Sequence, residues 1–390
     1  MLISLQVKRL AVILCSLMVL SLTGCWNYRE VEKVTTVAGI AIDKGDKDGE
    51  IQLTVEVVDG SGGEDVLNVG SNRITLTGKT MFDVVRKMIT QSGRRLYWAH
   101  AKSIILSQDI AREGSARIID WYVRDTETRA DIHILVSGEK TAEAVLRNDG
   151  GLNAPLSFKI DEMLKNEKSL SNAPVMEIFD FADTVNTPGI SSVLPMIYLT
   201  EHDKHTTASV QGMAVFDRDR MLGTIHADDT KYALFLRDEI KGGILTLGDY
   251  NHPPGISLEI FKNKTKVKPV LVDGQIEIRV KTQTVTVLDE AQFNGVDYIA
   301  PKGREEIEKL AEDMLVKKME NVIHIAQTQY HQDIFGFGDR IHKKMPKLWK
   351  TLVADWDERF SKLKVTVESD VVIRGTASTK KPLKMEEEDE

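Results

Sequence analysis

The chain has 390 residues, of which 42% are hydrophobic and 28% are charged, so it can fill the core of a globular protein with about two or three domains. Its 51 Lys and Arg residues against 59 Asp and Glu residues give a formal charge of −8, which disfavours a protein that wraps nucleic acid. The two cysteines are Cys15 and Cys25, so the sequence beyond residue 25 offers no disulfide framework, no cysteine zinc site and no thiol nucleophile.

The first residues have the pattern of an export signal. Lys8 and Arg9 precede Leu10–Leu22, a stretch that is apolar except for Ser16 and Ser21. A membrane-spanning helix needs roughly 20 apolar residues, so this stretch is too short to span a bilayer comfortably. It has the dimensions of a signal-peptide core.

The end of this stretch, Leu22-Thr23-Gly24-Cys25, resembles a bacterial lipobox, in which a peptidase cleaves before the cysteine and the sulfur carries a diacylglyceryl group. An ordinary cleaved signal with a chance cysteine is the alternative. We therefore predict that residues 1–24 are a lipoprotein signal peptide and that Cys25 is lipidated; two acyl chains give stable anchoring. Cleavage leaves 49 basic against 59 acidic residues, a formal charge of −10, so the lipid and not the net charge would hold the protein at a membrane.

The predicted anchor is separated from the first predicted strand by only five residues, Trp26-Asn27-Tyr28-Arg29-Glu30. Because an extended segment of this length reaches at most about 18 Å, the folded body should lie close to the bilayer. Trp26 and Tyr28 suit a position at the membrane interface. Packing of the same two side chains against the first domain is an equally good interpretation.

The predicted N-terminal domain, residues 25–150, mixes strands with short helices. Thr80 with Asp83 three residues later is a helix N-cap pattern, and apolar residues from Met81 to Ile89 form one stripe. Alternating apolar residues elsewhere indicate strands. The predicted strands are 31–43, 51–58, 73–77, 96–100, 103–107 and 131–136, and the predicted helices are 80–91, 115–123 and 141–147.

Residues 151–208 are predicted to form a helical, proline-containing middle segment that ends in a linker. Helices are expected at 156–165 and 174–185. The polar run 201–207 has the composition of a linker. Four of the ten prolines fall in this part of the chain: Pro155, Pro174, Pro188 and Pro195.

The predicted C-terminal domain, residues 209–375, begins with a hairpin and a helix and continues as an antiparallel run with a turn at Asp273-Gly274. Two long amphipathic helices and a last strand follow, and residues 376–390 are predicted to be a disordered charged tail. Together these features predict an α+β, multi-domain fold with mixed or antiparallel sheets and packed helices. The expected strands are 210–216, 221–226, 244–247, 255–261, 266–272, 275–288 and 363–373, and the expected helices are 228–240, 304–330 and 346–360.

The motif search finds no convincing catalytic, metal or cofactor site, and we predict a protein that is not an enzyme and that binds neither a cofactor nor a metal. Gly78-Lys79-Thr80 is the tail of a phosphate-binding loop, but the glycine needed five residues earlier is Arg73. Gly336-Phe337-Gly338 lacks the third glycine of a dinucleotide-binding fingerprint and is predicted to be a turn. The run His202–His205 holds two histidines and an aspartate, for which a solvated linker is the favoured interpretation over a metal site.

Four alternating lysines, Lys262, Lys264, Lys266 and Lys268, surround a predicted strand break. They could contact anionic lipid headgroups. The more common role of such charges is to protect an edge strand from aggregation, and we favour this role.

Several segments together resemble one protein family, and they occur in the family's order from about residue 22 to residue 375. The family is the Ger(x)C spore germination lipoproteins, GerAC-like C subunits of nutrient germinant receptors. Asn27 departs from the pattern, because the family usually has aspartate there. The segments that carry the resemblance are Gly24-Cys25-Trp26-Asn27-Tyr28-Arg29-Glu30, Gly39-Ile40-Ala41-Ile42-Asp43, Leu96-Tyr97-Trp98-Ala99-His100, Arg124-Asp125-Thr126-Glu127, Gly212-Met213-Ala214-Val215-Phe216 and Asp333-Ile334-Phe335-Gly336-Phe337-Gly338.

The resemblance implies a lipoprotein on the outer face of the inner spore membrane. It would act in a complex with an integral-membrane A subunit and a transporter-like B subunit that senses nutrients. The family is not known to be enzymatic, and only the lipidation site, Cys25, transfers as a site residue. Whether the protein binds a small molecule directly stays open.

A lipid-anchored solute-binding protein is the alternative hypothesis, because it would share the lipobox and the extracytoplasmic location. It predicts two α/β lobes around a ligand cleft, usually built on parallel sheets, and the antiparallel pattern of residues 210–290 opposes it. A cell-envelope hydrolase, the third class, would need a nucleophile, a metal or paired acids that the sequence does not supply.

Overall fold

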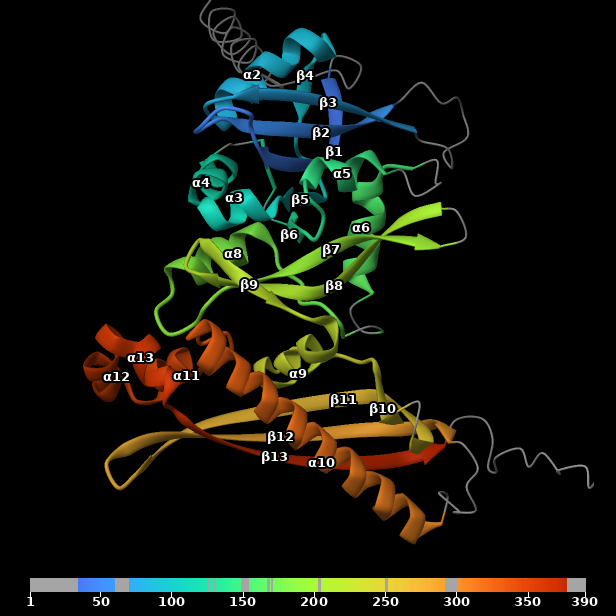
Figure 1. Ribbon diagram of the computed structural model, residues 1–390, viewed down its shortest axis with the longest axis vertical. Coiled ribbons are helices and arrows are strands. Elements are labelled where there is room, and N and C mark those ends of the chain that lie inside the picture. The colour runs from blue at the N-terminus through green and yellow to red at the C-terminus, as the bar shows by residue number, and fades with distance from the viewer. Residues whose placement is uncertain are drawn as a thin grey trace, which may run out of the picture.

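Two β-sheets, one above the other along the long axis of the molecule, organise the chain (Figure 1). The computed structural model describes residues 34–59, 70–124, 127–129, 131–148, 154–166, 169, 171–202, 205–249, 252–291 and 300–376. The predicted signal peptide, the lipidation site Cys25 and the predicted tail beyond Thr376 therefore lie outside the described residues. Among the described residues, no helix is both long and apolar enough to cross a membrane.

The first sheet combines a parallel centre with antiparallel borders. Its strands are, in chain order, β1 (Val34–Lys44), β2 (Ile51–Asp59), β3 (Gly70–Gly78), β4 (Arg95–Tyr97), β5 (Ser103–Leu106), β6 (His133–Ser137), β7 (Val193–His202), β8 (His205–Asp217) and β9 (Arg220–Ile225). They lie in the order β3-β2-β1-β5-β6-β7-β8-β9, with β4 beside the start of β1. The pairs β1–β5, β5–β6 and β6–β7 are parallel, whereas both borders are antiparallel.

Helices cover both faces of this sheet, which explains why residues 37–43 of β1 are all buried. Successive side chains of a strand point to opposite faces, so Ile40 and Ile42 join one apolar cluster while Ala41 joins the other. One face is covered by α2 (Met81–Ser92), α3 (Gln108–Glu113), α4 (Ala116–Arg124) and α8 (Ile178–Asn186), and the other by α5 (Ala142–Arg147) and α6 (Leu156–Lys165). We call this sheet with its helices the first unit.

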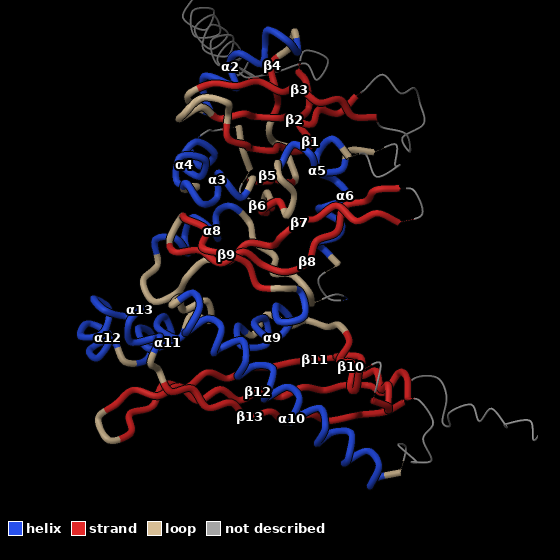
Figure 2. Tube along the Cα trace, viewed as in Figure 1, coloured by secondary structure: helices blue, strands red, loops and turns tan. Residues whose placement is uncertain are grey.

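The second sheet has four strands and is covered by helices on one face. Its strands are β10 (Ile244–Asp249), β11 (His252–Val272), β12 (Gln275–Ala291) and β13 (Lys364–Thr376). The first three are antiparallel, and β13 runs parallel to β12. The helices of this second unit are α9 (Ala227–Arg237), α10 (Pro301–Ile325), α11 (Phe337–Lys344), α12 (Pro346–Leu352) and α13 (Trp356–Ser361). Figure 2 shows α10 crossing the sheet from one end to the other.

Strand β8 belongs to the first sheet but contributes to the cores of both units. Met213 and Val215 pack in the apolar cluster of the second unit, whereas Ala214 and Phe216 pack in that of the first. The strand spans the position, residue 208, at which the middle segment was expected to give way to the C-terminal domain. Strand β8 therefore joins the two units by packing its side chains in both cores, and not only by connecting them along the sequence.

The structure confirms the predicted α+β class, with mixed sheets and packed helices. It also confirms the capped helix that begins after Thr80, the hairpin now seen as β8 and β9, the antiparallel run β10-β11-β12 and the long helix α10. The long helix ends at Ile325 and is continued by a π-helical turn, η2 (Ala326–Tyr330).

Three element predictions are corrected. The run 201–207 was expected to be a linker, but its described residues, 201, 202 and 205–207, lie in the paired strands β7 and β8. The strand break expected among the lysines is absent, because β11 is continuous and has only bulges, at 257/258 and 260/262. The second long helix is divided into α12 and α13 by a 3₁₀ turn at Val353–Asp355, although Trp349, Leu352, Trp356 and Phe360 still bury one common face.

Candidate functional site

The loop between η2 and α11 is built around one buried carboxylate, that of Asp333, which is 1% exposed. Its Oδ1 accepts the backbone N–H groups of Phe335 at 3.2 Å and Phe337 at 3.1 Å. Its Oδ2 accepts the backbone N–H of Gly338 at 2.8 Å and the indole N–H of Trp356 at 3.1 Å. The carboxylate therefore caps the first turn of α11 and ties it to α13.

A loop of the first unit, between α8 and β7, packs directly against this turn. The backbone N–H of Ser191 donates to the carbonyl of Asp333 at 2.8 Å, and that of Asp339 donates to the carbonyl of Gly189 at 3.0 Å. Gly189 has a φ of +85°, and a Cβ on Gly338 would lie 2.7 Å from the Gly189 Cα. Only glycine permits this approach. We call residues 189–191, residues 333–339 and the Trp356 ring the joint.

Aromatic rings support the joint from the side of the second unit. The ring centroids of Phe335 and Phe337 are 5.2 Å apart, and those of Trp349 and Trp356 are 5.3 Å apart. Phe337 and Phe360 are fully buried. Such edge-on and tilted pairs are stabilising beyond the area they bury, so the cluster holds the Asp333 loop in one conformation.

Burial raises the pKa of Asp333 to about 6, against the opposing effect of its N–H donors. The cost of removing this carboxylate from water thus exceeds the stabilisation from the hydrogen bonds that it accepts. The folded chain consequently holds the proton on Asp333 more tightly than the unfolded chain does.

A polar cleft of about 640 Å³ opens beside the joint, between the two units. Asp217, Arg218 and Asp219 line it from the turn between β8 and β9, and Asp355, Asp357 and Glu358 line it from the second unit. Burial raises the pKa of Asp357, and the nearby charge of Asp217 adds to the effect. The cleft is therefore negatively charged and would favour a polar or cationic solute over an acidic one.

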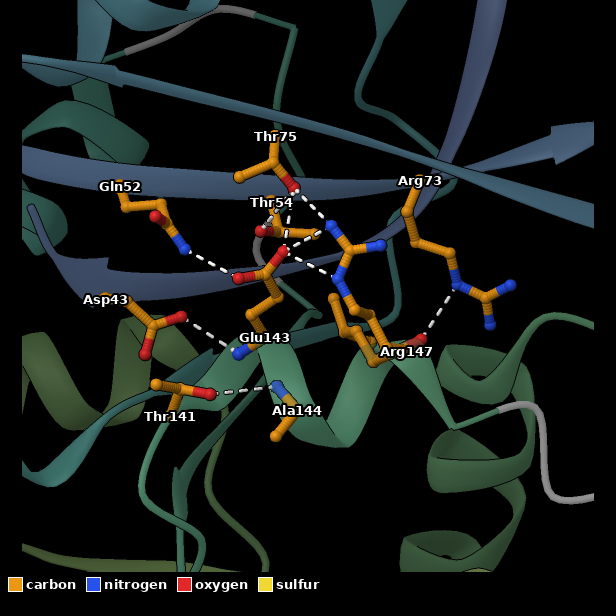
Figure 3. A network of polar contacts seen from close by, with 10 residues as sticks. Asp43, Gln52, Thr54, Arg73, Thr75, Thr141, Glu143, Ala144 and Arg147 are labelled. Atoms are coloured by element: carbon orange, nitrogen blue, oxygen red, sulfur yellow. Dashed lines mark hydrogen bonds and ion pairs between the residues drawn. The ribbon is translucent and has the colours of Figure 1, made fainter.

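Two further buried carboxylates hold helices against the first sheet. The Asp43 side chain accepts N–H groups of the first turn of α5 at 2.7 and 2.9 Å, and burial raises its pKa. Figure 3 shows Glu143 of the same helix between Gln52 (2.7 Å), Thr75 (3.1 Å) and Arg147 (2.7 Å). These bonds fix α5 across strands β2 and β3.

The third carboxylate, Glu56, is fully buried and caps α6. It accepts the backbone N–H groups of Leu156 (2.9 Å) and Ser157 (3.0 Å), the Ser157 hydroxyl (2.6 Å) and the guanidinium of Arg73 (3.2 Å). A Cβ on Gly39 would overlap the Ser157 side chain. Gly39 is thus required because α6 comes so close to β1.

The residues weighed as sites from the sequence have structural roles where they are described. The Thr80 hydroxyl accepts the N–H of Asp83 at 3.2 Å, as the predicted N-cap requires. His202 and His205 are partners in the β7–β8 hairpin. In the part of the chain that the structure describes, no three His, Cys, Asp or Glu side chains are grouped so that they could hold a metal ion.

Two family models match the chain over most of its length. The model described as "Spore germination protein N-terminal domain" matches residues 27–199, and the model described as "Spore germination B3/ GerAC like, C-terminal" matches residues 211–377. The chain belongs to the Ger(x)C family of spore germination proteins. The first match ends within β7, and the second begins within β8, the strand that the two units share.

Curated relatives of the Ger(x)C type match along nearly their whole length. Spore germination protein B3 of Bacillus subtilis (strain 168) is 24% identical, over 88% of this chain and 91% of that protein. Spore germination protein KC of the same organism is 24% identical over 98% and 99%, and spore germination protein YndF is 25% identical over 94% and 97%.

The crystal structure of the GerBC protein has the same fold. The two structures superpose with a TM-score of 0.55 at 20% sequence identity, over 86% of this chain and 97% of that chain. At this identity the match supports the Ger(x)C fold and says nothing about individual residues.

Two of the segments that resemble the Ger(x)C family, 39–43 and 333–338, contain the residues that cap helices or form the joint. Gly39 makes room for α6, Asp43 caps α5, and Asp333 caps α11. In the segment 96–100, Trp98 packs edge-on against Trp121 at 5.4 Å. In these three segments the fold therefore depends on particular residues.

Sequence reasoning predicted residues 336–338 to be a turn, included Asp333 only in a segment that resembles the family, and did not single out Glu56. The prediction is corrected in part: Gly336, with a φ of +73°, ends the turn, whereas Phe337 and Gly338 already belong to α11. An aspartate followed by a glycine-rich turn into a helix was the available signal for Asp333. For Glu56 the sequence held no such signal, because the helix that it caps begins 100 residues later.

Proposed function

We propose that this Ger(x)C chain is the lipid-anchored, non-enzymatic C subunit of a spore nutrient germinant receptor, acting through contacts with the membrane A and B subunits. The observation that carries the proposal is that proteins named for spore germination match both units and the joint between them, over nearly their full lengths. The buried carboxylates described above are used as helix caps, which supports a structural and not a catalytic role for them.

The proposed anchor is a diacylglyceryl group on Cys25, on the outer face of the inner spore membrane. The lipobox-like run that ends at this cysteine supports it. Nine residues lead from Cys25 to Val34, the first residue of β1, so the chain can place this strand at most about 32 Å from the anchor. The first unit would therefore lie near the bilayer.

A receptor subunit can bias a switch only if it contacts the resting and triggered states differently. The joint supports this role, because it fixes the second unit relative to the first unit and its anchor. A contact made by the second unit would then be held at a defined position relative to the membrane subunits.

Deletion of the gene tests the proposal. Spores that lack the chain should fail to germinate with particular nutrients, yet germinate normally with agents that bypass the receptors. Supplying the gene again should restore the nutrient response. An unchanged nutrient response, in a strain without a compensating paralogue, would refute the proposal.

The anchor and its short tether have their own test. Cys25→Ala should release the protein from the membrane and reduce the nutrient response. A long Gly/Ser insert after Arg29 should weaken the response although lipidation persists, and the same insert placed after Thr376 is the matched control. Full activity with the insert after Arg29 would contradict close docking to the membrane subunits.

A solute-binding role is the second candidate, and the cleft of about 640 Å³ beside the joint is the observation that favours it. The antiparallel second sheet opposes it, because solute-binding lobes are usually built on parallel sheets. Calorimetry of the protein with candidate nutrients separates the two roles. Tight direct binding, abolished by Asp357→Ala in the cleft, would favour solute binding.

A further inference from the structure

The helix-free face of the second sheet presents a regular grid of side chains on three strands. Burial alternates along β12, so its odd-numbered residues from 277 to 287 point away from the helices. The strand register places Lys266 opposite Lys281, and Lys268 opposite Arg279. In the pairing of β12 with β13, the register places Lys281 opposite Glu368. We call this surface the basic face.

Two like-charge pairs thus lie next to each other on neighbouring strands, an arrangement that destabilises a sheet. Lys281 is compensated by Asp370 at 3.0 Å. Among the described residues, by contrast, Lys266, Lys268 and Arg279 form no ion pair. A chain with a formal charge of −8 has concentrated uncompensated positive charge at one place.

Protection of an edge strand explains only part of this charge. β10 pairs with β11 from His252 to Glu259, so the lysines farther along β11 do lie at a sheet edge. Arg279 and Lys281 belong to β12, which has β11 on one side and β13 on the other. Their charge therefore needs another explanation.

The basic face is hollow. Its cavity has a volume of about 790 Å³ and is lined by five cations against two carboxylates, Glu277 and Glu368. A flat lipid surface cannot fill a hollow, whereas a convex protein segment can. An exposed apolar side chain on the same face, Val372 at 49%, also suits a protein contact, which combines apolar and polar groups.

We propose that the basic face, centred on Lys266, Lys268 and Arg279, is a docking site for a convex, acidic segment of another protein. Carboxylates of the partner would sit among the uncompensated cations and relieve their mutual repulsion. Complementary charge would also steer the encounter and fix its orientation. The inference depends on the proposed function in one respect only, which is that the partner is present in the spore.

Photo-crosslinking in spores tests the inference with the full chain. A photoreactive amino acid replaces Gln283, a neutral residue within the hollow. We expect a protein adduct whose crosslinked peptide is rich in Asp and Glu. Its yield should fall at least tenfold in the triple variant Lys266→Gln, Lys268→Gln, Arg279→Gln.

The matched control is the triple variant Lys302→Gln, Lys347→Gln, Lys350→Gln, which removes the same charge from exposed positions elsewhere. It should change the adduct yield less than twofold. The basic-face variant should also unfold at the same or a higher temperature, because it removes repulsion.

Four results would overturn the inference: no adduct, an adduct with phospholipid, a protein adduct that the charge removal does not reduce, or a lower unfolding temperature of the basic-face variant. The outcome is separable from that of the proposed function. If the chain with an intact basic face forms no adduct while germination still depends on the gene, the docking site alone is refuted. If that chain forms an acidic protein adduct while deletion of the gene leaves the nutrient response unchanged, the receptor role alone is refuted.

Discussion

The joint and the basic face place ionisable side chains in opposite environments. At the joint, the carboxyl group of Asp333 is buried and its oxygens accept N–H groups on both sides, so the hydrogen bonds of this group build the fold. On the basic face, Lys268 and Arg279 are opposite each other and have no acidic partner among the described residues. A buried and satisfied charge indicates a structural role, whereas an exposed and uncompensated charge indicates an external partner.

Asp333→Ala should have the largest effect on stability. It leaves several buried N–H donors without an acceptor, so the free energy of unfolding should fall by about 3–5 kcal/mol. Urea unfolding measures this change. Asp355→Ala is the control nearby, since that exposed carboxylate forms an ion pair with Arg359 across one helical turn and its loss should cost at most about 0.5 kcal/mol. Equal effects of the two variants would contradict the role of the joint.

Titration of the same carboxyl group, that of Asp333, should make the free energy of unfolding depend on pH. The folded chain keeps the proton on Asp333 up to about pH 6, whereas the unfolded chain releases it near 3.8. Its ionisation therefore lowers the free energy of unfolding, by about 3 kcal/mol, as the pH rises from about 4 to 6. Urea unfolding of the wild type and of Asp333→Asn across this range isolates the contribution. A wild type that gains stability relative to the variant with rising pH would reverse the predicted sign.

Gly39→Ala should have a smaller but clear effect. The added Cβ would overlap the Ser157 side chain and push α6 away from β1, so the free energy of unfolding should fall by about 1–3 kcal/mol. Gly375→Ala is the control, because a Cβ there meets nothing within 4 Å. Thermal unfolding of both variants measures the change in stability. If Gly39→Ala leaves the stability unchanged, α6 can shift away from β1 without cost.

The smallest expected effect is an increase, not a decrease, in the free energy of unfolding. Arg279→Thr removes one member of a like-charge pair and should raise the free energy of unfolding by roughly 0.2–1 kcal/mol. Lys281→Thr is matched on the same strand but breaks the ion pair with Asp370, so it should give no gain. Chemical unfolding compares the two. Destabilisation by Arg279→Thr would indicate that the basic face serves the fold and not a partner.

The sequence predicted elements well where the local pattern agreed with the final packing. Helix α2 has its cap and its apolar stripe within twelve residues, and it forms as predicted. Strand β7, which contains Pro195, was not predicted, because residues 151–208 were expected to form a helical segment that ends in a linker. The structure accommodates this proline beside a register shift between Pro195 and Ile197, a position where a missing N–H is tolerated.

The joint could not be predicted as a site, because its parts are far apart in the sequence. Ser191 and Asp333 meet only after both units have folded. The apolar pattern of residues 346–360 correctly predicted the burial of Trp349, Leu352 and Trp356, whereas Val353 is exposed. No glycine or internal proline marked the 3₁₀ turn that divides the helix. Resemblance of residues 333–338 to a family pattern indicated that they matter, and the structure supplies the physical reason.

Affinity purification of the chain from detergent-solubilised spore membranes, followed by mass spectrometry, tests the central claim most directly. The account predicts a chain that begins at an acylated Cys25 and co-purifies with integral-membrane A and B subunits. Recovery of the chain alone, unacylated and with residues 1–24 intact, would contradict it.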